Sequence, residues 1–162
     1  MAEREGLRFH PRRTSGGLDV GVEENKKIVA SMWDCLYRKD FDGVAAHIAA
    51  DGFYEDVPAP DPGARGPENV VKRLRSGLDS VVRFEHDIHR VVAEGDEVIV
   101  EHTETWHFET GELLTNHFVT VHEVKDGKIA LWRDYWDINT MMSQAPKWWI
   151  EHLATVDSAE WS

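Results

Sequence analysis

The chain has 162 residues, with 18 Lys and Arg against 30 Asp and Glu, so its formal net charge is −12 at pH 7. This length and the 41% hydrophobic content are typical of one globular domain with a full core. An acidic chain without a stripe of Lys and Arg is not expected to bind nucleic acid, and no apolar run is long enough for a membrane span or a signal peptide.

The first half of the chain is predicted to be mainly helical. Residues 1–21 mix charges, Pro and Gly without periodicity, which predicts a mobile N-terminal arm. Residues 22–39 have helical apolar spacing and contain the single cysteine, Cys35, as a packed core thiol. A chain that cannot form an internal disulfide fits a reducing, cytoplasmic setting. The next elements are a helix, a strand, a turn-rich loop and a helix with Pro at its first position: 41–50, 53–57, 58–66 and 67–82.

From residue 83 the hydrophobic period changes from 3.6 to 2. Short Gly-containing turns then connect four predicted strands, which makes neighbours antiparallel: 83–93, 97–109, 113–124 and 128–138. Residues 143–156 are expected to form a C-terminal helix or an arm that closes over the sheet. We therefore expect an α+β domain over 22–142, with helices on one face of a curved sheet, and a C-terminal segment over 143–162.

Alternation of side chains places an acidic group on the apolar face of the last strand. In 128–138, Asp134 lies between Trp132 and Trp136, and the more polar residues point to the opposite face. A carboxylate among tryptophans is costly unless it is protonated, hydrogen-bonded or paired. Such a group is a candidate for an acid or a base with a tuned pKa.

Two further strands repeat this pattern, which predicts a pocket where the three strands converge. The polar candidates for catalysis are Tyr54, Asp56, His102, Glu104 and Asp134. The apolar candidates for substrate contact, on the same faces of the strands, are Trp132, Trp136, Trp106, Phe108 and Val100. The alternative is that each polar group is a satisfied core or rim residue, or that a β-bulge shifts the phase of a strand.

Three segments of the sequence resemble the limonene-1,2-epoxide hydrolase family. They are "FYEDVPAP…GARGPENVV", "EVIVEHTE" and above all "DGKIALWRDYWD". The resemblance implies a cone-shaped barrel of the SnoaL-like, NTF2-like superfamily, with helices packed on the concave side of a highly curved mixed or antiparallel sheet. It also implies a deep apolar pocket for a small apolar molecule, no cofactor or metal, and a homodimer.

The resemblance assigns roles to the polar candidates. In the family, an aspartate on the "WRDY" strand activates water, and it matches Asp134. A tyrosine and an asparagine hold the water; here they match Tyr54 and Asp56, so the amide has become an acid. An "RxD" pair supplies a bridging arginine and the acid that protonates the epoxide oxygen, and it matches His102 and Glu104.

The loss of the arginine changes the expected electrostatics. A guanidinium is permanently charged and bridges two carboxylates, whereas a histidine does so only when protonated. Because Asp56, Glu104 and Asp134 converge, at least one acid pKa is expected to be raised, and the imidazolium form of His102 is expected to be favoured. A protonated Glu104 then serves as the acid and Asp134 as the base.

Four functions are compatible with these residues. The first is cofactor-independent hydrolysis of an apolar epoxide to a vicinal diol. The second is a proton-transfer reaction of a cyclase, isomerase or dehydratase that uses His102 and Asp134, and the third is non-catalytic binding of an apolar ligand. The fourth, least favoured, is a divalent metal site formed by the three acids and His102.

Overall fold

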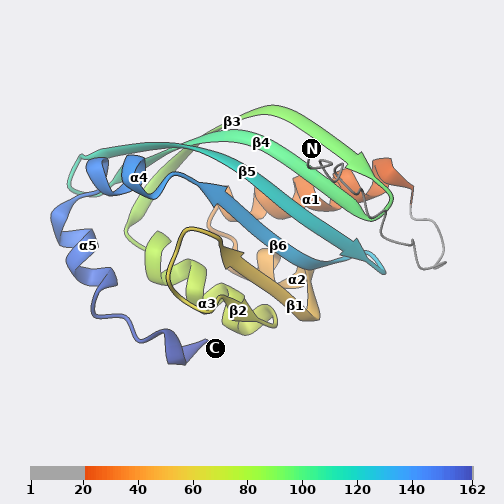
Figure 1. The fold of residues 1–162 in the computed structure, drawn as a ribbon, viewed down its shortest axis with the longest axis horizontal. Helices are drawn as coiled ribbons and strands as arrows, with labels where there is room; N and C mark the ends of the chain where they lie inside the picture. Colours follow the sequence, from red (N-terminus) through yellow and green to blue (C-terminus); the bar gives the residue numbers. More distant parts are fainter. Residues whose placement is uncertain (1–20, 162) are drawn as a thin grey trace, which may run out of the picture.

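The computed structural model describes residues 21–161, in which six strands form one sheet (Figure 1). The arm predicted for residues 1–21 lies outside the described residues apart from Gly21, and it stays a prediction. The elements are α1 Val22–Tyr37, α2 Phe41–His47, β1 Ile48–Asp56, β2 Ala64–Arg65, α3 Pro67–Leu78, β3 Val81–Glu94, β4 Glu97–Phe108, β5 Leu113–Lys125, β6 Lys128–Trp136, α4 Ile138–Gln144, α5 Lys147–Leu153 and a 3₁₀ turn η1 Ser158–Glu160.

The sheet is mixed and has the order β2-β1-β6-β5-β4-β3. The predicted meander of β3 to β6 is confirmed, because each of these neighbours pairs antiparallel. β1 joins β6 in parallel, and this register places Tyr54 opposite Trp132 and Asp56 opposite Asp134. The predicted α+β class is thus confirmed, and the parallel pair brings one acid of the first strand beside one acid of the last.

The prediction of a helix over 41–50 is wrong beyond His47. Ile48 already pairs with Ile129 of β6, so strand pairing overrides the helical preference of the alanines that follow. The register shifts between Ile48 and Phe53, and Gly52 lies in this irregular stretch. A Cβ at Gly52 would lie 2.8 Å from the Ile129 carbonyl oxygen, so only glycine fits this close approach. The third helix likewise ends at Leu78, before 82, because β3 begins at Val81.

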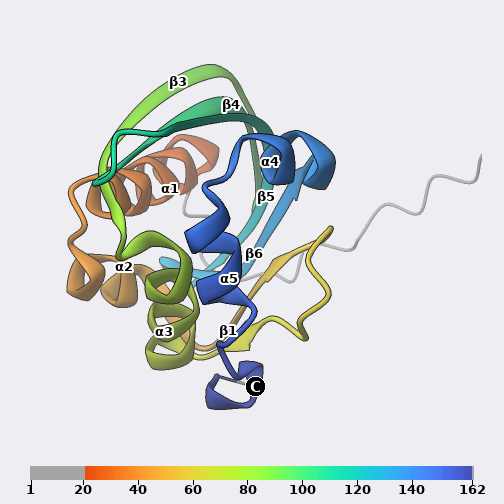
Figure 2. The same cartoon turned by 90° about the vertical axis from the view of Figure 1, so that its left-hand side faces the viewer.

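Helices α1, α2 and α3 lie on the concave side of the curved sheet (Figures 1 and 2). Apolar residues at helical spacing face inward from two of them, and inward side chains of the strands complete one core: Val29, Met32, Trp33 and Leu36 of α1, Val70, Leu74 and Leu78 of α3, and Val98, Val100, Leu114 and Ile129 of the sheet. Cys35 is buried in this core, as predicted. None of the helices over residues 21–161 is long and apolar enough to cross a membrane.

The C-terminal segment forms two short helices and a 3₁₀ turn, where one helix or an arm was expected. The Asp137 side chain caps α4 by accepting from the backbone N–H of Asn139. α5 lies beside α3 and the sheet (Figure 2). The Trp149 indole donates to the Gly77 carbonyl oxygen at 2.8 Å and packs edge-on against Trp106 of β4. This segment therefore lies over the apolar concave face.

Candidate active site

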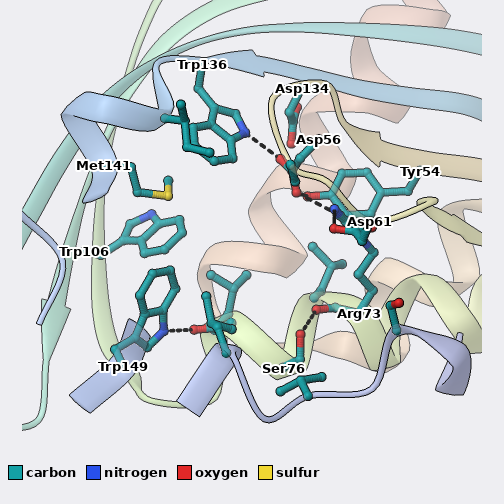
Figure 3. Close-up of a pocket in the computed structure, with 18 of the residues that line it drawn as sticks. Tyr54, Asp56, Asp61, Arg73, Ser76, Trp106, Asp134, Trp136, Met141 and Trp149 are labelled. Carbon is teal, nitrogen blue, oxygen red and sulfur yellow. Dashed lines mark hydrogen bonds and ion pairs between the residues drawn. The ribbon is translucent and has the colours of Figure 1, made fainter. Parts of the chain in front are cut away.

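A cavity of about 590 Å³ lies between the sheet, α3 and the C-terminal segment (Figure 3). One part of its lining is polar and consists of Tyr54, Asp56, Asp61, Arg73, Glu104 and Asp134. The rest is largely apolar and includes Trp33, Trp106, Phe118, Trp132, Trp136, Met141, Trp149, Ile150, Leu153 and Trp161. Apolar surroundings with a few converging polar groups are typical of a small-molecule site.

Asp134 lies in this lining and is almost fully buried. Its Oδ1 accepts hydrogen bonds from the Thr120 hydroxyl at 2.6 Å and from the Trp132 indole at 2.9 Å. Both hydrogen bonds that described side chains make to Asp134 go to Oδ1, which leaves Oδ2 for a ligand. Burial, then the charges of Asp56 and Glu104, raise the pKa of Asp134 well above its usual range. Once ionised, it is a strong base for a carboxylate.

Glu104 is held at both of its carboxyl oxygens. The Tyr37 hydroxyl donates to Oε1 at 2.7 Å and the Trp106 indole donates to Oε2 at 2.6 Å. Burial raises the pKa of Glu104 to about 7, although these two donors act in the opposite direction. Near neutral pH the side chain therefore exists in both forms, which suits a proton donor.

Among Asp56, Glu104 and Asp134, Asp56 is the carboxylate that pairs with an arginine. Its Oδ1 accepts from the Trp136 indole at 2.7 Å, and its Oδ2 accepts from the Tyr54 hydroxyl at 3.0 Å and from Arg73 at 2.8 Å (Figure 3). The same guanidinium binds both carboxylate oxygens of Asp61 at 2.8 and 2.9 Å and lies 4.6 Å from the centre of the Tyr54 ring. Of the described residues that line the cavity, Arg73 is the one with a permanent positive charge.

Each of the three acids thus has its own indole donor. Trp132 and Trp106 lie two residues from the acid they contact, on the same face of the same strand, whereas Trp136 reaches Asp56 across the pair of β6 and β1. The tryptophans that the sequence marks as an apolar surface therefore also orient the carboxyl groups. Hydrogen bonds to charged groups are stronger than neutral ones, so these donors restrict the acids to defined orientations.

The expectation that the imidazolium form of His102 is favoured is wrong. Its side chain is completely buried and does not line the cavity. Burial, followed by the neighbouring His86 and His122, lowers the pKa of His102 to about 3. His102 is therefore neutral, because the cost of removing an imidazolium from water exceeds what Glu104 provides from 3.6 Å.

The hypothesis of a metal site is not supported either. In the described range, no group of three or more His, Cys, Asp or Glu side chains could hold a metal ion. Both ring nitrogens of His102 are hydrogen-bonded, to His86 and to Thr120. They are therefore not available as ligands.

The structure divides the apolar candidates into two groups. Trp106, Trp132 and Trp136 line the cavity. Val100 and Phe108 share the buried face of β4 but are not part of the lining. Phe108 is covered by the indole rings of Trp148 and Trp149, so it supports the cavity from behind.

Four residues of the site were not among the sequence candidates: Tyr37, Asp61, Arg73 and Thr120. Arg73 lies at helical spacing from Val70 on the buried face of α3, and this placement is visible in the sequence. Thr120 shares the inward face of β5 with Phe118, which alternation also reveals. Asp61 lies in an irregular loop and carries no such signal.

Known proteins with similar sequences and structures include epoxide hydrolases. Residues 23–147 match the family model described as the limonene-1,2-epoxide hydrolase catalytic domain. The epoxide hydrolase EphG of Mycobacterium tuberculosis is 37% identical over 114 residues, which cover 70% of this chain and 73% of EphG. A solved structure of an M. tuberculosis LEH-like epoxide hydrolase has a TM-score of 0.66 at 31% identity and covers 82% of this chain and 94% of that chain.

The fold itself recurs in more distant structures. An NTF2-like protein of unknown function from Burkholderia pseudomallei has a TM-score of 0.66 at 20% identity, over 75% of this chain and 96% of that chain. At this identity the similarity concerns the fold alone. It confirms the NTF2-like architecture that the sequence led us to expect.

Proposed function

The chain belongs to the limonene-1,2-epoxide hydrolase family, and on that premise we propose that it opens an apolar epoxide to a vicinal diol by direct attack of water. The observation that carries the proposal is the arrangement of Asp134 and Glu104. Asp134 is a buried carboxyl group with one oxygen left for a ligand, and Glu104 has a pKa of about 7. Both side chains line the same largely apolar cavity.

In the proposed reaction, Asp134 accepts a proton from a water molecule through Oδ2. The water oxygen attacks one ring carbon, the bond from that carbon to the ring oxygen breaks, and Glu104 donates its proton to that oxygen. The product is a diol, and the reaction leaves Asp134 protonated and Glu104 ionised. Tyr54 and Asp56 hold the water in this scheme, with Arg73 compensating the charge of Asp56.

The shape and polarity of the cavity support an apolar substrate. The cavity volume of about 590 Å³ lies within the range of pockets that bind small, drug-sized molecules. The tryptophans and Met141 would contact its hydrocarbon part, and the ring oxygen would face the acids. A substrate with its own negative charge is disfavoured, because four acidic side chains and a single arginine line the cavity.

The second candidate, a proton-transfer enzyme, loses its main support. That hypothesis gave His102 a role as base beside Asp134. A histidine that does not line the cavity and has a pKa of about 3 is neither reachable nor basic enough at neutral pH. Epoxide opening needs only the acid and base that line the cavity.

We also propose that the protein is a homodimer whose contact is the outward face of the sheet. Apolar side chains on this face are exposed on neighbouring strands: Val92, Ile99, Val119 and Tyr135. Val92 pairs with Ile99, and Val119 pairs with Tyr135. A second copy would cover this apolar area.

A turnover assay in labelled water tests the proposed hydrolysis. The enzyme, in excess, is mixed with terpene, styrene and fatty-chain epoxides in H₂¹⁸O, and the diol is analysed by mass spectrometry. Direct attack puts ¹⁸O into the diol in the first turnover, whereas a covalent carboxylate ester would give unlabelled diol. Asp134→Asn is expected to lose about 10²–10⁴-fold in kcat/KM, as for removal of a general base, while the exposed Asp126→Asn keeps full activity.

Three results would contradict the proposal. The first is the absence of diol from every epoxide with folded wild-type protein. The second is exchange of deuterium next to a substrate carbonyl, which would favour proton transfer. The third is binding of apolar ligands, altered in Asp134→Asn, without any turnover, which would favour a binding protein.

A further inference from the structure

A chain of hydrogen bonds crosses the sheet behind the cavity and ends at Asp134. His86 Nε2 of β3 lies 3.0 Å from His102 Nδ1 of β4, and His102 Nε2 lies 3.0 Å from Thr120 Oγ1 of β5. Thr120 then donates to Asp134 Oδ1 of β6 at 2.6 Å. Four consecutive strands of the sheet thus each contribute one side chain to a continuous series.

The donors of this series can be assigned. When Asp134 is ionised, Thr120 gives its one hydroxyl proton to that carboxylate, so His102 donates from Nε2 to the Thr120 oxygen. A neutral imidazole has one donor and one acceptor, which leaves His102 Nδ1 to accept from His86 Nε2. Every donor in the series therefore points toward Asp134.

Strand pairing explains why these residues meet. Thr120 and Asp134 are direct register partners in the antiparallel pair of β5 and β6. His102 and Thr120 lie diagonally, since the partner of Thr120 on β4 is Val100. His86 is diagonal to His102 as well, opposite Glu104. Direct and diagonal neighbours on one face of a sheet are within reach of side chains of this length.

We propose that His86, His102 and Thr120 form a positioning relay that keeps Asp134 ionised and turns its free oxygen toward the cavity. His86 is the positioning residue that sets the tautomer of His102, and His102 in turn sets the direction of the Thr120 hydroxyl. Neutral donors thereby hold the Asp134 carboxylate in place of a cation. The inference rests on the proposed function, because it assigns Asp134 as the base.

Several titratable groups surround the relay, and apart from His89 in the control variant they stay unchanged in the tests below. Asp34, Asp87 and His89 face His86. Tyr54, Asp56, Glu104 and Tyr37 lie around Asp134, and His122 lies beside His102. Burial is the largest cause of the raised pKa of Asp134, and the charges of Asp56 and Glu104 raise it further. Loss of a hydrogen-bond donor to Asp134 is therefore expected to raise this pKa still more.

Thr120→Val is the most direct variant, because it keeps the shape and removes the hydroxyl. Without that donor the carboxylate is less stable, so the acid limb of the kcat/KM profile is expected to move to higher pH by about one unit or more. Thr120→Ser keeps the hydroxyl and is expected to restore the wild-type profile. Near-ultraviolet circular dichroism establishes that each variant is folded.

His86→Phe tests the far end of the relay. A ring that packs against Tyr37 is kept and the donor is lost, so a smaller shift of the acid limb in the same direction is expected. His86→Gln retains an N–H donor and is expected to reduce the shift. His89→Phe is the matched control, since His89 bonds to Thr103 and contributes no hydrogen bond to the relay.

The protonation states of the relay histidines can also be measured without a turnover assay. Nitrogen-15 NMR of the histidines is expected to show His102 neutral and protonated on Nε2 at pH 7 in the wild-type protein. Protonation on Nδ1 or on both nitrogens would overturn the inference, and so would unchanged acid limbs in both Thr120→Val and His86→Phe. If the wild-type protein hydrolyses no epoxide, the proposed function fails, and the NMR result alone decides the relay.

Discussion

Asp56 and Asp134 are register partners across the parallel strands β1 and β6, yet their electrostatic surroundings differ. Asp56 forms an ion pair with Arg73, whereas the side-chain partners of Asp134 are a hydroxyl and an indole. Two adjacent carboxyl groups with unequal surroundings separate their roles. Asp56, held by Arg73, is suited to hold water, and Asp134 is suited to exchange a proton.

The pH dependence of turnover is expected to reflect Glu104. Because burial raises the pKa of Glu104 to about 7, the acid form disappears above that pH. We expect kcat/KM to fall by about tenfold for each pH unit above 7. Glu104→Gln is expected to lose about 10²–10⁴-fold in activity and to lack this alkaline limb. A wild-type profile that stays flat to pH 9 would exclude Glu104 as the acid.

The same side chain is expected to influence stability. The pKa of Glu104 is raised in the folded protein from 4.5 to about 7, so its contribution to the free energy of unfolding is largest below pH 4.5 and declines up to about pH 7. Wild-type protein is expected to lose stability relative to Glu104→Gln over this range, by roughly 3 kcal/mol at most. Urea unfolding at pH 5 and pH 8 measures this difference, and an equal pH response of the two proteins would refute it.

Removal of Arg73 is expected to destabilise the fold strongly. Arg73→Met leaves two partly buried carboxylates, Asp56 and Asp61, without their cation, and loss of one partner from a buried ion pair costs about 3 kcal/mol or more. Lys72→Met is the matched control on the same helix. Its exposed ion pair with Glu68 is worth less than about 1 kcal/mol. Chemical denaturation measures the free energy of unfolding of both variants. Similar losses of stability in Arg73→Met and Lys72→Met would mean that the ion pairs of Arg73 with Asp56 and Asp61 do not stabilise the fold.

The adjacent tryptophans of α5 provide a matched pair for testing the cavity. Trp149 is buried against Trp106 and lines the cavity, whereas Trp148 is 37% exposed. Trp149→Ala is expected to raise KM for an apolar epoxide by about tenfold or more and to cost about 3–5 kcal/mol of stability. Trp148→Ala is expected to change KM little. Steady-state kinetics and thermal unfolding distinguish them, and equal KM values would show that α5 does not contact the substrate.

The proposed dimer is tested by a charge on the outward face of the sheet. Val119 is 41% exposed and lies opposite Tyr135, so Val119→Glu would bury a carboxylate in the contact. Analytical ultracentrifugation is expected to find a wild-type dimer and a monomeric Val119→Glu. Val57→Glu, away from this face at the end of β1, is expected to stay dimeric. A wild-type monomer at high concentration would contradict the proposal.

Strand regularity decided which site residues the sequence could predict. The pairing of β4 with β5 runs without a register shift, so alternation correctly placed His102 and Glu104 on the buried face. The pairing of β3 with β4 shifts twice, and the inward position of His86 could not be read from alternation alone. Short regular turns likewise made the meander predictable.

Other features depend on contacts between distant segments. The sequence pattern of α3 places Arg73 on the buried face of that helix. Its ion pair with Asp61 could not be predicted, because it depends on the path of the irregular loop that carries Asp61. The neutral state of His102 follows from the depth of its burial, which no local pattern reports. The early end of α2 reflects pairing of Ile48 with β6, a contact 81 residues away in the chain (129 − 48).

The acids with their indole donors all belong to strands of the sheet, whereas α5 and the residues after it supply a separate part of the cavity lining. Apart from Trp149, which packs against Trp106, residues between 147 and 161 can therefore be substituted to alter which molecules fit without displacing the reacting groups. The C-terminal segment is thus the natural region to randomise when the substrate range is to be redesigned, and exchanging it between relatives would transfer selectivity while the proton chemistry is retained.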